Sequence, residues 1–238
     1  MLITEQQFFD YIKCPVLYDL KYNRGFYLND TPSIKHILEK ASIAFYNQAL
    51  NTRKAPSFNF LTQKYESLFK PYIGIIPAKK YNEGLFLLRN FYNWANSKRI
   101  VVIDSSAKYT LTYKGNILEG IMNPISINEK NILEFLIINY SYRKPEQSNI
   151  DRKLKYTIDM LAYNESNQDN IVATKIHHCK SNTDYVTTRN KIDNDRLYAT
   201  LDNVCKGIEK EIFYPRESIM CDQCLYKNIC RGWKGKEN

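Results

Sequence analysis

The chain has 238 residues, of which 44% are apolar, and it carries a formal net charge of +9. A chain of this length and composition buries a core of its own and needs no disulfide framework. Its longest apolar stretch falls far short of the roughly 20 residues of a membrane span, so we expect no membrane association. The opening MLITEQQFFDYIK lacks the basic and apolar regions of a secretory leader, and we expect a reducing, cytoplasmic compartment.

The basic residues lie in short groups that alternate with many of the 19 tyrosines. One group is Lys79-Lys80 and another runs from Arg152 to Lys155. Such a surface attracts polyanions because binding releases their counterions, and nucleic acid is the usual partner. A surface that is only well solvated would have the same composition, so both interpretations stay open at this point.

The first third of the chain is predicted to be helical. Thr4 and Gln7 have the spacing of a capping box, and apolar residues then follow at helical spacing until the break at Cys14-Pro15. A second helix should end near Gly25. Three more helices are expected over residues 32–50, 58–69 and 79–97, with loops that contain prolines between them.

From residue 99 the pattern changes to short β-rich runs, which predict a meander of three or four strands: RIVVID, KYTLTYK, NILEGIMNPISIN and NILEFLIINYSY. A helix is expected over residues 147–163, a strand in NIVATKIHH and a helix over residues 189–209. This order of strands and helices predicts an α/β fold in a single domain, 1–238. We divide it into a helical part (1–98), an α/β core (99–210) and a cysteine-containing C-terminal segment (211–238).

The segment CDQCLYKNIC places three cysteines, Cys221, Cys224 and Cys230, within a short stretch. A C-x-x-C pair points two thiolates at one metal site, and the third cysteine adds another ligand. Zinc and an iron-sulfur cluster both need a fourth ligand, and a chance grouping of buried thiols is the alternative. The residues that could supply that ligand are Cys14, Cys179, Cys205, His177 and His178.

Sequence context around the cysteines resembles a known family. TEQQFFDYIKCPVLYDLKY is similar to the N-terminal signature, and FYPRESIMCDQCLYKNIC to the C-terminal signature, of the iron-sulfur members of the PD-(D/E)XK nuclease superfamily. These include RecB- and AddB-type nuclease domains and CRISPR-associated adaptation exonucleases. The resemblance covers both ends of the chain, and covers the middle only by pattern.

The resemblance implies a restriction-endonuclease-like core, in which helices flank a mixed central sheet. It also implies that Cys14, Cys221, Cys224 and Cys230 bind a 4Fe-4S cluster, which staples the N-terminal helical part to the C-terminus. Binding of such a cluster becomes folding free energy, because it closes a loop that spans nearly the whole chain. Zinc remains the rival metal.

Family members cleave phosphodiesters with Mg²⁺ or Mn²⁺ held by carboxylates, next to a lysine on the same strand face. Here Asn123 stands in place of the aspartate of Gly-x-x-Asp, and a neutral amide is a weak ligand for a hard cation. Glu134 is present in the next motif, but Leu136 replaces its lysine. We therefore expect a vestigial active site, in which Glu134 is the one catalytic candidate.

Other carboxylates and histidines give this site little support. Asp104 or Glu119 could assist Glu134, and His36 is out of register with the histidine of the family pattern. The alternative for Glu134 is a buried carboxylate paired with Lys153 or Lys155. His177-His178 at the end of an apolar strand is more typical of a structural pair than of a metal site.

We favour a DNA-binding or scaffolding protein without catalysis, which acts in DNA processing, replication or recombination with a helicase, nuclease or other partner. Its nucleic-acid contacts would come from Arg152, Lys153, Lys155, Arg231 and Lys234, and Tyr140, Tyr142 or Tyr156 could stack on unpaired bases of single strands or ends. The alternative is an active Mg²⁺- or Mn²⁺-dependent exonuclease for single-stranded DNA with migrated catalytic residues. A zinc-stapled protein-interaction module is a third possibility.

Overall fold

The computed structural model describes residues 1–28, 31–98, 101–168, 170–230 and 232. They form a mixed α/β structure with two compact units. Unit 1 comprises Met1–Asp30, Tyr109–Gly120 and Asn194–Asn238, and unit 2 comprises Thr31–Lys108 and Ile121–Asp193. The single-domain organisation expected from the sequence stays a prediction.

Unit 2 is built on a five-stranded sheet of order β2-β5-β6-β7-β8. Its strands are β2 (Val101–Asp104), β5 (Ile125–Ile127), β6 (Leu133–Asn139), β7 (Thr174–His178) and β8 (Thr183–Thr187). Strands β6 and β7 are parallel and the other neighbours are antiparallel, so the sheet is mixed. A parallel pair needs a crossover, and here helices supply it.

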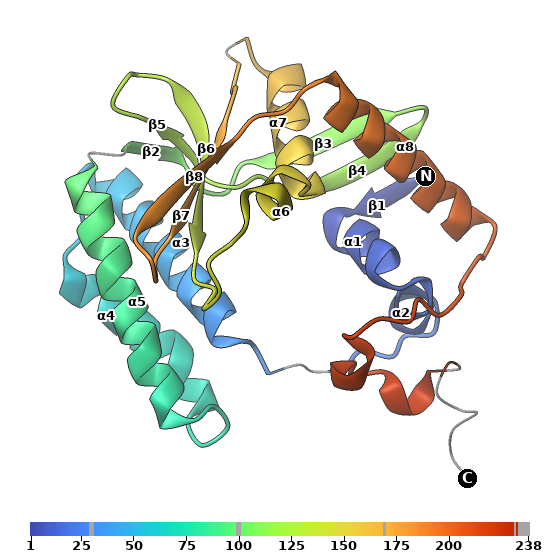
Figure 1. The fold of residues 1–238 in the computed structure, drawn as a ribbon, viewed down its shortest axis with the longest axis horizontal. Helices are drawn as coiled ribbons and strands as arrows, with labels where there is room; N and C mark the ends of the chain where they lie inside the picture. Colours follow the sequence, from blue (N-terminus) through green and yellow to red (C-terminus); the bar gives the residue numbers. More distant parts are fainter. Residues whose placement is uncertain (29–30, 99–100, 169, 231, 233–238) are drawn as a thin grey trace. The chain divides into compact units, whose positions relative to one another are not determined.

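Helices cover both faces of this sheet (Figure 1). On one face lie α3 (Ile34–Thr52), α4 (Phe58–Phe69) and α5 (Ala78–Ser97), and on the other lie α6 (Gln147–Asp151) and α7 (Leu154–Ser166). Successive side chains of β6 point to opposite faces of the sheet and so pack against one or the other of these two groups of helices. Leu136 and Ile138 join the core formed by α3–α5, whereas Ile137 packs beside Tyr156 of α7.

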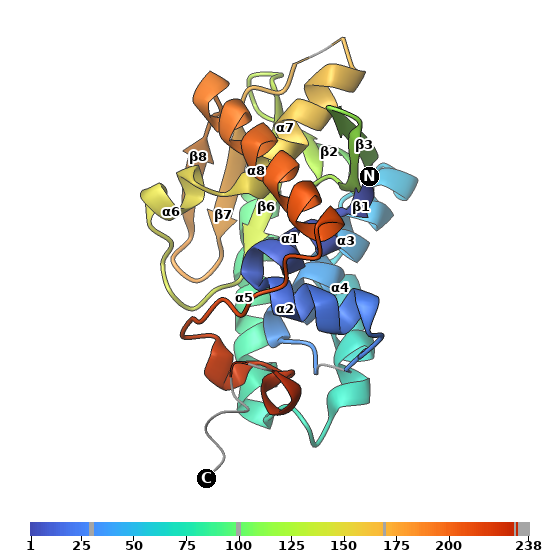
Figure 2. The same cartoon turned by 90° about the vertical axis from the view of Figure 1, so that its right-hand side faces the viewer.

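Unit 1 contains a three-stranded sheet of order β1-β4-β3, from β1 (Leu2–Thr4), β3 (Lys108–Tyr113) and β4 (Asn116–Ile121). Lys114 and Gly115 both have positive φ, as the two central residues of a tight hairpin turn require. Helices α1 (Glu5–Lys13) and α8 (Lys191–Glu209) lie side by side (Figure 2), where the Tyr11 hydroxyl donates to the Ile212 carbonyl.

Several predicted elements are confirmed. Helix α4 has the predicted bounds, α3, α5 and α8 shift by one or two residues at their ends, and Thr4 and Gln7 form the capping box. Helix α1 ends at the Cys14-Pro15 break, and α2 (Pro15–Tyr18) follows and continues as a π-type turn. No helix within the described residues is long and apolar enough to cross a bilayer.

The predicted β-meander is wrong in its connections. Strands β3 and β4 form a hairpin that belongs to the sheet of unit 1 and not to the five-stranded sheet. Strand β2 pairs instead with β5, which follows the hairpin in sequence. Strands β1 and β8 were not predicted, and α6 and α7 are two helices where one was predicted. Strand pairing depends on distant partners, which local patterns do not specify.

Candidate functional site

The four cysteines of the two sequence signatures line one cavity of about 330 Å³ in unit 1. Cys14 lies at the break between α1 and α2. Cys221 opens a 3₁₀ turn that Cys224 ends, and Cys230 ends a second 3₁₀ turn. Residues from opposite ends of the sequence therefore meet around the same space.

The cavity wall combines apolar and charged residues. Leu17 and Tyr226 supply apolar surface, and the charged residues are two cations, Lys13 and Arg216, and two carboxylates, Glu217 and Asp222. The Ser218 N–H donates to the Cys221 Sγ at 3.4 Å. Hydrogen bonds of this kind are among the means by which proteins stabilise and tune metal-bound sulfurs.

The other two cysteines lie outside this cavity. Cys179 and Cys205 are both fully buried. Burial raises the pKa of the Cys205 thiol to about 11, and burial raises the pKa of Cys179 as well. Both stay neutral thiols in the structure described, which suits a packing role.

The described part of the chain contains no group of three or more Cys, His, Asp or Glu side chains arranged to hold one metal ion, and this finding includes the four cysteines of the cavity. A single zinc ion holds its sulfurs about 2.3 Å away and so draws them close together.

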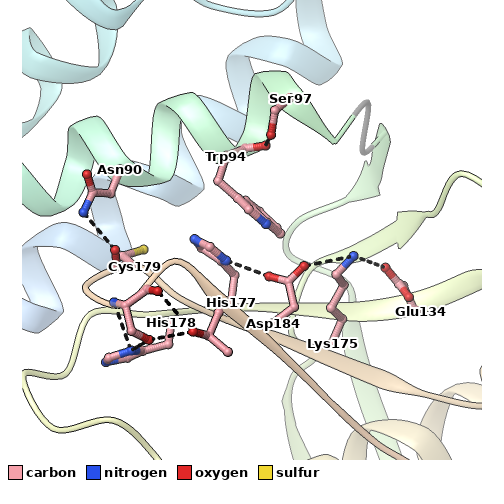
Figure 3. A network of polar contacts seen from close by, with 11 residues as sticks. Asn90, Trp94, Ser97, Glu134, Lys175, His177, His178, Cys179 and Asp184 are labelled. Carbon is pink, nitrogen blue, oxygen red and sulfur yellow. Dashed lines mark hydrogen bonds and ion pairs between the residues drawn. The ribbon is translucent and has the colours of Figure 1, made fainter.

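Glu134 of β6 belongs to a polar network in unit 2 (Figure 3). The Lys175 Nζ lies 4.0 Å from the Glu134 Oε1 and 3.7 Å from the Asp184 Oδ2, so one ammonium stands between two carboxylates. The Asn128 amide donates to the other Glu134 oxygen at 3.2 Å. The lysine partner of Glu134 is thus Lys175 on β7, and neither Lys153 nor Lys155.

His177 extends the same network and is completely buried. Its Nδ1 lies 2.7 Å from the Asp184 Oδ1, and its ring stacks on Trp94 with ring centroids 4.0 Å apart. Burial lowers the pKa of His177 more than the hydrogen bond with Asp184 raises it. His178 is also buried and bonds Ser181 and the Ser141 carbonyl, so both histidines have structural contacts.

The structure does not bring Asn123 together with Glu134 and Leu136. Leu136 packs into the core beneath α3–α5, on the same sheet face as Glu134. Asn123 instead turns to α7 on the other face, where its amide donates to the Asp159 Oδ2 at 2.6 Å. Any residual chemistry at Glu134 would therefore have to use other partners.

The remaining residues considered for catalysis are also scattered. Asp104 at the end of β2 accepts a hydrogen bond from the Ser106 N–H, and His36 is exposed on α3. Glu119 belongs to β4 in unit 1. Asp159, Lys175 and Asp184 were not predicted from the sequence. The spacing of Lys155 and Asp159 by four residues in a helix was the one available signal for a pair.

The predicted nucleic-acid residues differ in their surroundings. Arg152 and Lys153 are exposed at the junction of α6 and α7. The Lys155 ammonium turns inward, 2.8 Å from the Asp159 Oδ1. Arg231 and Lys234 lie outside the described residues.

Only one of the three predicted stacking tyrosines is exposed. Tyr140 and Tyr156 are buried, at 2% and 4% exposure, and cannot stack on bases in this structure. Tyr142 is 39% exposed. The ammonium groups of Lys80 and Lys180 lie 4.5 and 4.8 Å from its ring centroid, and its hydroxyl bonds Glu83.

Comparison with known proteins gives a structural likeness only. No protein-family model matches the sequence, and no curated protein sequence matches it. The crystal structure of a "putative exonuclease" from Eubacterium rectale matches with a TM-score of 0.57 at 7% identity, over 100% of this chain and 88% of that one. The structure of SSO0001 matches at 10% identity over 96% and 93% of the two chains, with a TM-score of only 0.40.

The likeness to the Eubacterium rectale protein defines the class of fold. Together with mixed sheets flanked by helices, it shows that this chain shares the fold of that protein. At 7% identity the likeness extends to the fold alone.

Proposed function

We propose that this chain is an iron-sulfur protein of PD-(D/E)XK type, of the RecB/AddB-like kind, that binds DNA without cutting it. The observation that carries the proposal is the separation of Asn123 from Glu134 on opposite faces of the sheet, each occupied by a partner of its own. A two-carboxylate metal site needs its ligands on one side of one cleft. In this proposal the chain keeps the nuclease fold but lacks the arrangement of metal ligands that catalysis needs.

The proposed cofactor is a 4Fe-4S cluster held by Cys14, Cys221, Cys224 and Cys230. All four line the 330 Å³ cavity, and a backbone N–H already donates to the Cys221 sulfur. When bound, a cluster would cross-link the α1–α2 break to the C-terminal segment. Its binding free energy would then stabilise unit 1.

Metal analysis of anaerobically purified protein tests the cofactor. We expect brown protein with iron and acid-labile sulfide, and loss of the colour in Cys14→Ala and in Cys221→Ala. Cys205→Ala is the matched control, because Cys205 also lies in unit 1 but away from the cavity. It should keep its iron. Colourless protein that contains zinc would refute the cluster and favour the zinc-stapled interaction module.

The proposed DNA surface lies on unit 2. It includes the exposed Arg152 and Lys153, with Tyr142 as a stacking residue between Lys80 and Lys180. Base–aromatic stacking is worth about 1–3 kcal/mol per base, and lysines nearby can bind the phosphates. This surface does not rely on Lys155, whose ammonium is occupied by Asp159. Single strands and DNA ends are the expected ligands, with a helicase or nuclease as a protein partner.

Fluorescence anisotropy with labelled single-stranded DNA tests this surface across a range of salt concentrations. Affinity should fall steeply with salt, and Arg152→Gln/Lys153→Gln should reduce the slope by about one for each phosphate that is no longer neutralised. Tyr142→Leu should weaken single-strand binding more than duplex binding. Lys130→Gln, at an exposed turn, serves as the control. Salt-independent binding, or no binding, would refute a DNA role.

One observation favours the alternative of an active exonuclease. Glu134, Lys175 and Asp184 bring two carboxylates and a lysine together on adjoining strands of the sheet. An active enzyme would degrade single-stranded DNA with Mn²⁺ or Mg²⁺, and Glu134→Ala would abolish the degradation. Degradation that survives this substitution would come from a contaminant.

A further inference from the structure

The Lys155 ammonium is held among oxygen atoms at the start of α7. Its Nζ lies 2.8 Å from the Asp159 Oδ1 and 2.6 Å from the backbone carbonyl oxygen of Ile121. The lysine and the aspartate are separated by one helical turn, whereas Ile121 comes from the end of β4. The side chain of Lys155 is 21% exposed. Its charged end thus bridges a helix and a distant stretch of backbone.

Asp159 is the fixed centre of this arrangement. Its side chain is only 1% exposed, and its second oxygen accepts a hydrogen bond from the Asn123 amide at 2.6 Å. A buried carboxylate needs both a counter-charge and hydrogen bonds, because its desolvation is costly. Lys155 supplies the charge and Asn123 supplies a hydrogen bond. The carboxylate is oriented by a residue at the very position where the sequence lacks the expected aspartate.

The surroundings of the ammonium resemble those of a hard metal ion. Mg²⁺ and Mn²⁺ choose carboxylate and carbonyl oxygens, and here one of each faces a single positive charge. We propose that Lys155 is an internal cation that occupies a latent divalent-cation position formed by Asp159 and the Ile121 carbonyl. The inference rests on the proposed function, because it concerns the same inactive core and gives that core a second reason not to bind metal.

Metal binding by a variant without the ammonium tests this proposal. Lys155→Ala should bind one Mn²⁺ at least about tenfold more tightly than the unchanged protein, measured by isothermal titration. Mn²⁺ should also raise its Tm, since a ligand that binds only the folded state stabilises it. Adding Asp159→Asn should remove the new site, and adding Asn123→Asp should strengthen it by supplying a second carboxylate.

Lys206→Ala provides the matched control. Lys206 and Asp202 also form a pair with the same helical spacing, 2.7 Å apart, but the lysine side chain is 59% exposed. Water can solvate Asp202 after the lysine is removed, so neither a Mn²⁺ site nor a Mn²⁺-dependent rise in Tm should appear. Equal Mn²⁺ binding by the two variants would overturn the proposal.

Two further measurements test the proposal if Lys155→Ala fails to fold. Lys155→Met keeps most of the apolar stem without the charge, and a folded Lys155→Met that binds no more Mn²⁺ than the unchanged protein would overturn the proposal. In the unchanged protein, reductive methylation followed by mass spectrometry should modify Lys206 well before Lys155. Equal rates would show that the ammonium is not held in place and would also overturn it.

DNA anisotropy of Lys155→Met separates this proposal from the proposed function. The DNA affinity should stay near that of the unchanged protein, since the proposed surface does not use the Lys155 ammonium. Failure of the Mn²⁺ result with DNA binding intact would reject the internal cation alone. Loss of DNA binding in the unchanged protein would reject the proposed function while leaving the metal result to be judged separately.

Discussion

Buried charged side chains in unit 2 are paired with one another. Lys175 stands between Glu134 and Asp184, and His177 completes the network against Trp94 (Figure 3). A buried Glu134 paired with Lys153 or Lys155 was the alternative to a metal ligand, and its lysine partner is instead Lys175. A partner on a neighbouring parallel strand lies 41 positions away in sequence, 134 to 175, and no local spacing reports it.

We predict that His177 makes the stability of unit 2 depend on pH. Burial lowers its folded-state pKa below the unfolded value of about 6.5, so the unfolded chain takes up the proton more readily. Its contribution is therefore fully present above about pH 6.5 and is lost as pH falls below that value. Each unit of the shift is worth about 1.4 kcal/mol at most.

Urea unfolding at neutral and mildly acidic pH measures this effect. His177→Asn, which can keep a hydrogen bond to Asp184, should lose less stability on acidification than the unchanged protein. His36→Asn, on the exposed side of α3, is the control and should behave as the unchanged protein does. At lower pH Asp184 adds to the loss. Burial raises the pKa of Asp184, but His177 and Lys175 together lower it by more than burial raises it, so the net folded-state pKa is depressed.

At the scale of elements, the strongly amphipathic helices were predictable and the strand partners were not. Helix α4 matches its prediction because Ser57 caps it and apolar residues recur at helical spacing. Strand β8 escaped notice because it is short and half exposed. The division between α6 and α7 falls at residues 152–153, where no proline or glycine marks a break.

The packing of α4 against α5 gives a prediction for Gly84. A Cβ at this position would lie 2.2 Å from the Tyr65 Oη and 2.7 Å from its Cζ, and Tyr65 is fully buried. Gly84→Ala gains about 1 kcal/mol of helix propensity, but overpacking typically costs about 1–3 kcal/mol. We expect a net loss of roughly 1 kcal/mol, seen as a lower urea midpoint.

A double-mutant cycle identifies the side chain responsible. Tyr65→Phe removes the nearest atom, so Gly84→Ala should cost less in that background than alone. Asn93→Ala, at an exposed position of the same helix, should change stability by no more than about 0.5 kcal/mol. Equal costs of Gly84→Ala in both backgrounds would show that Tyr65 yields without strain.

At the scale of the whole molecule, the sequence indicated that its two ends belong together. The resemblance to the iron-sulfur nuclease signatures implied Cys14 as the fourth ligand, and all four cysteines line one cavity. Division into two units was not predictable, because no linker composition marks the places where the chain passes from one unit to the other. Two of those crossings lie within β3 and β4, one lies within α8, and one falls between residues 30 and 31.

We predict that removal of the proposed cluster loosens unit 1 and spares unit 2. Hydrogen exchange should speed up in α1, α2 and residues 211–230 of Cys14→Ala, while the α3–α5 core keeps its protection. Cys179→Ala, in the core of unit 2, should give the reverse pattern. Equal acceleration in both units of Cys14→Ala would mean that the cysteines stabilise the molecule as one body.

The order in which the chain visits its two units sets an order for synthesis. Unit 2 is complete once the ribosome has added Asp193, whereas unit 1 takes its first segment from Met1–Asp30 and its last from Asn194 onward. In the proposed cluster, Cys14 is made first and can share a ligand set with Cys230 only after the intervening residues have been added. Insertion of the proposed cluster would therefore follow the synthesis of unit 2, and a chain that stopped at Asp193 would hold Cys14 without the other three proposed ligands.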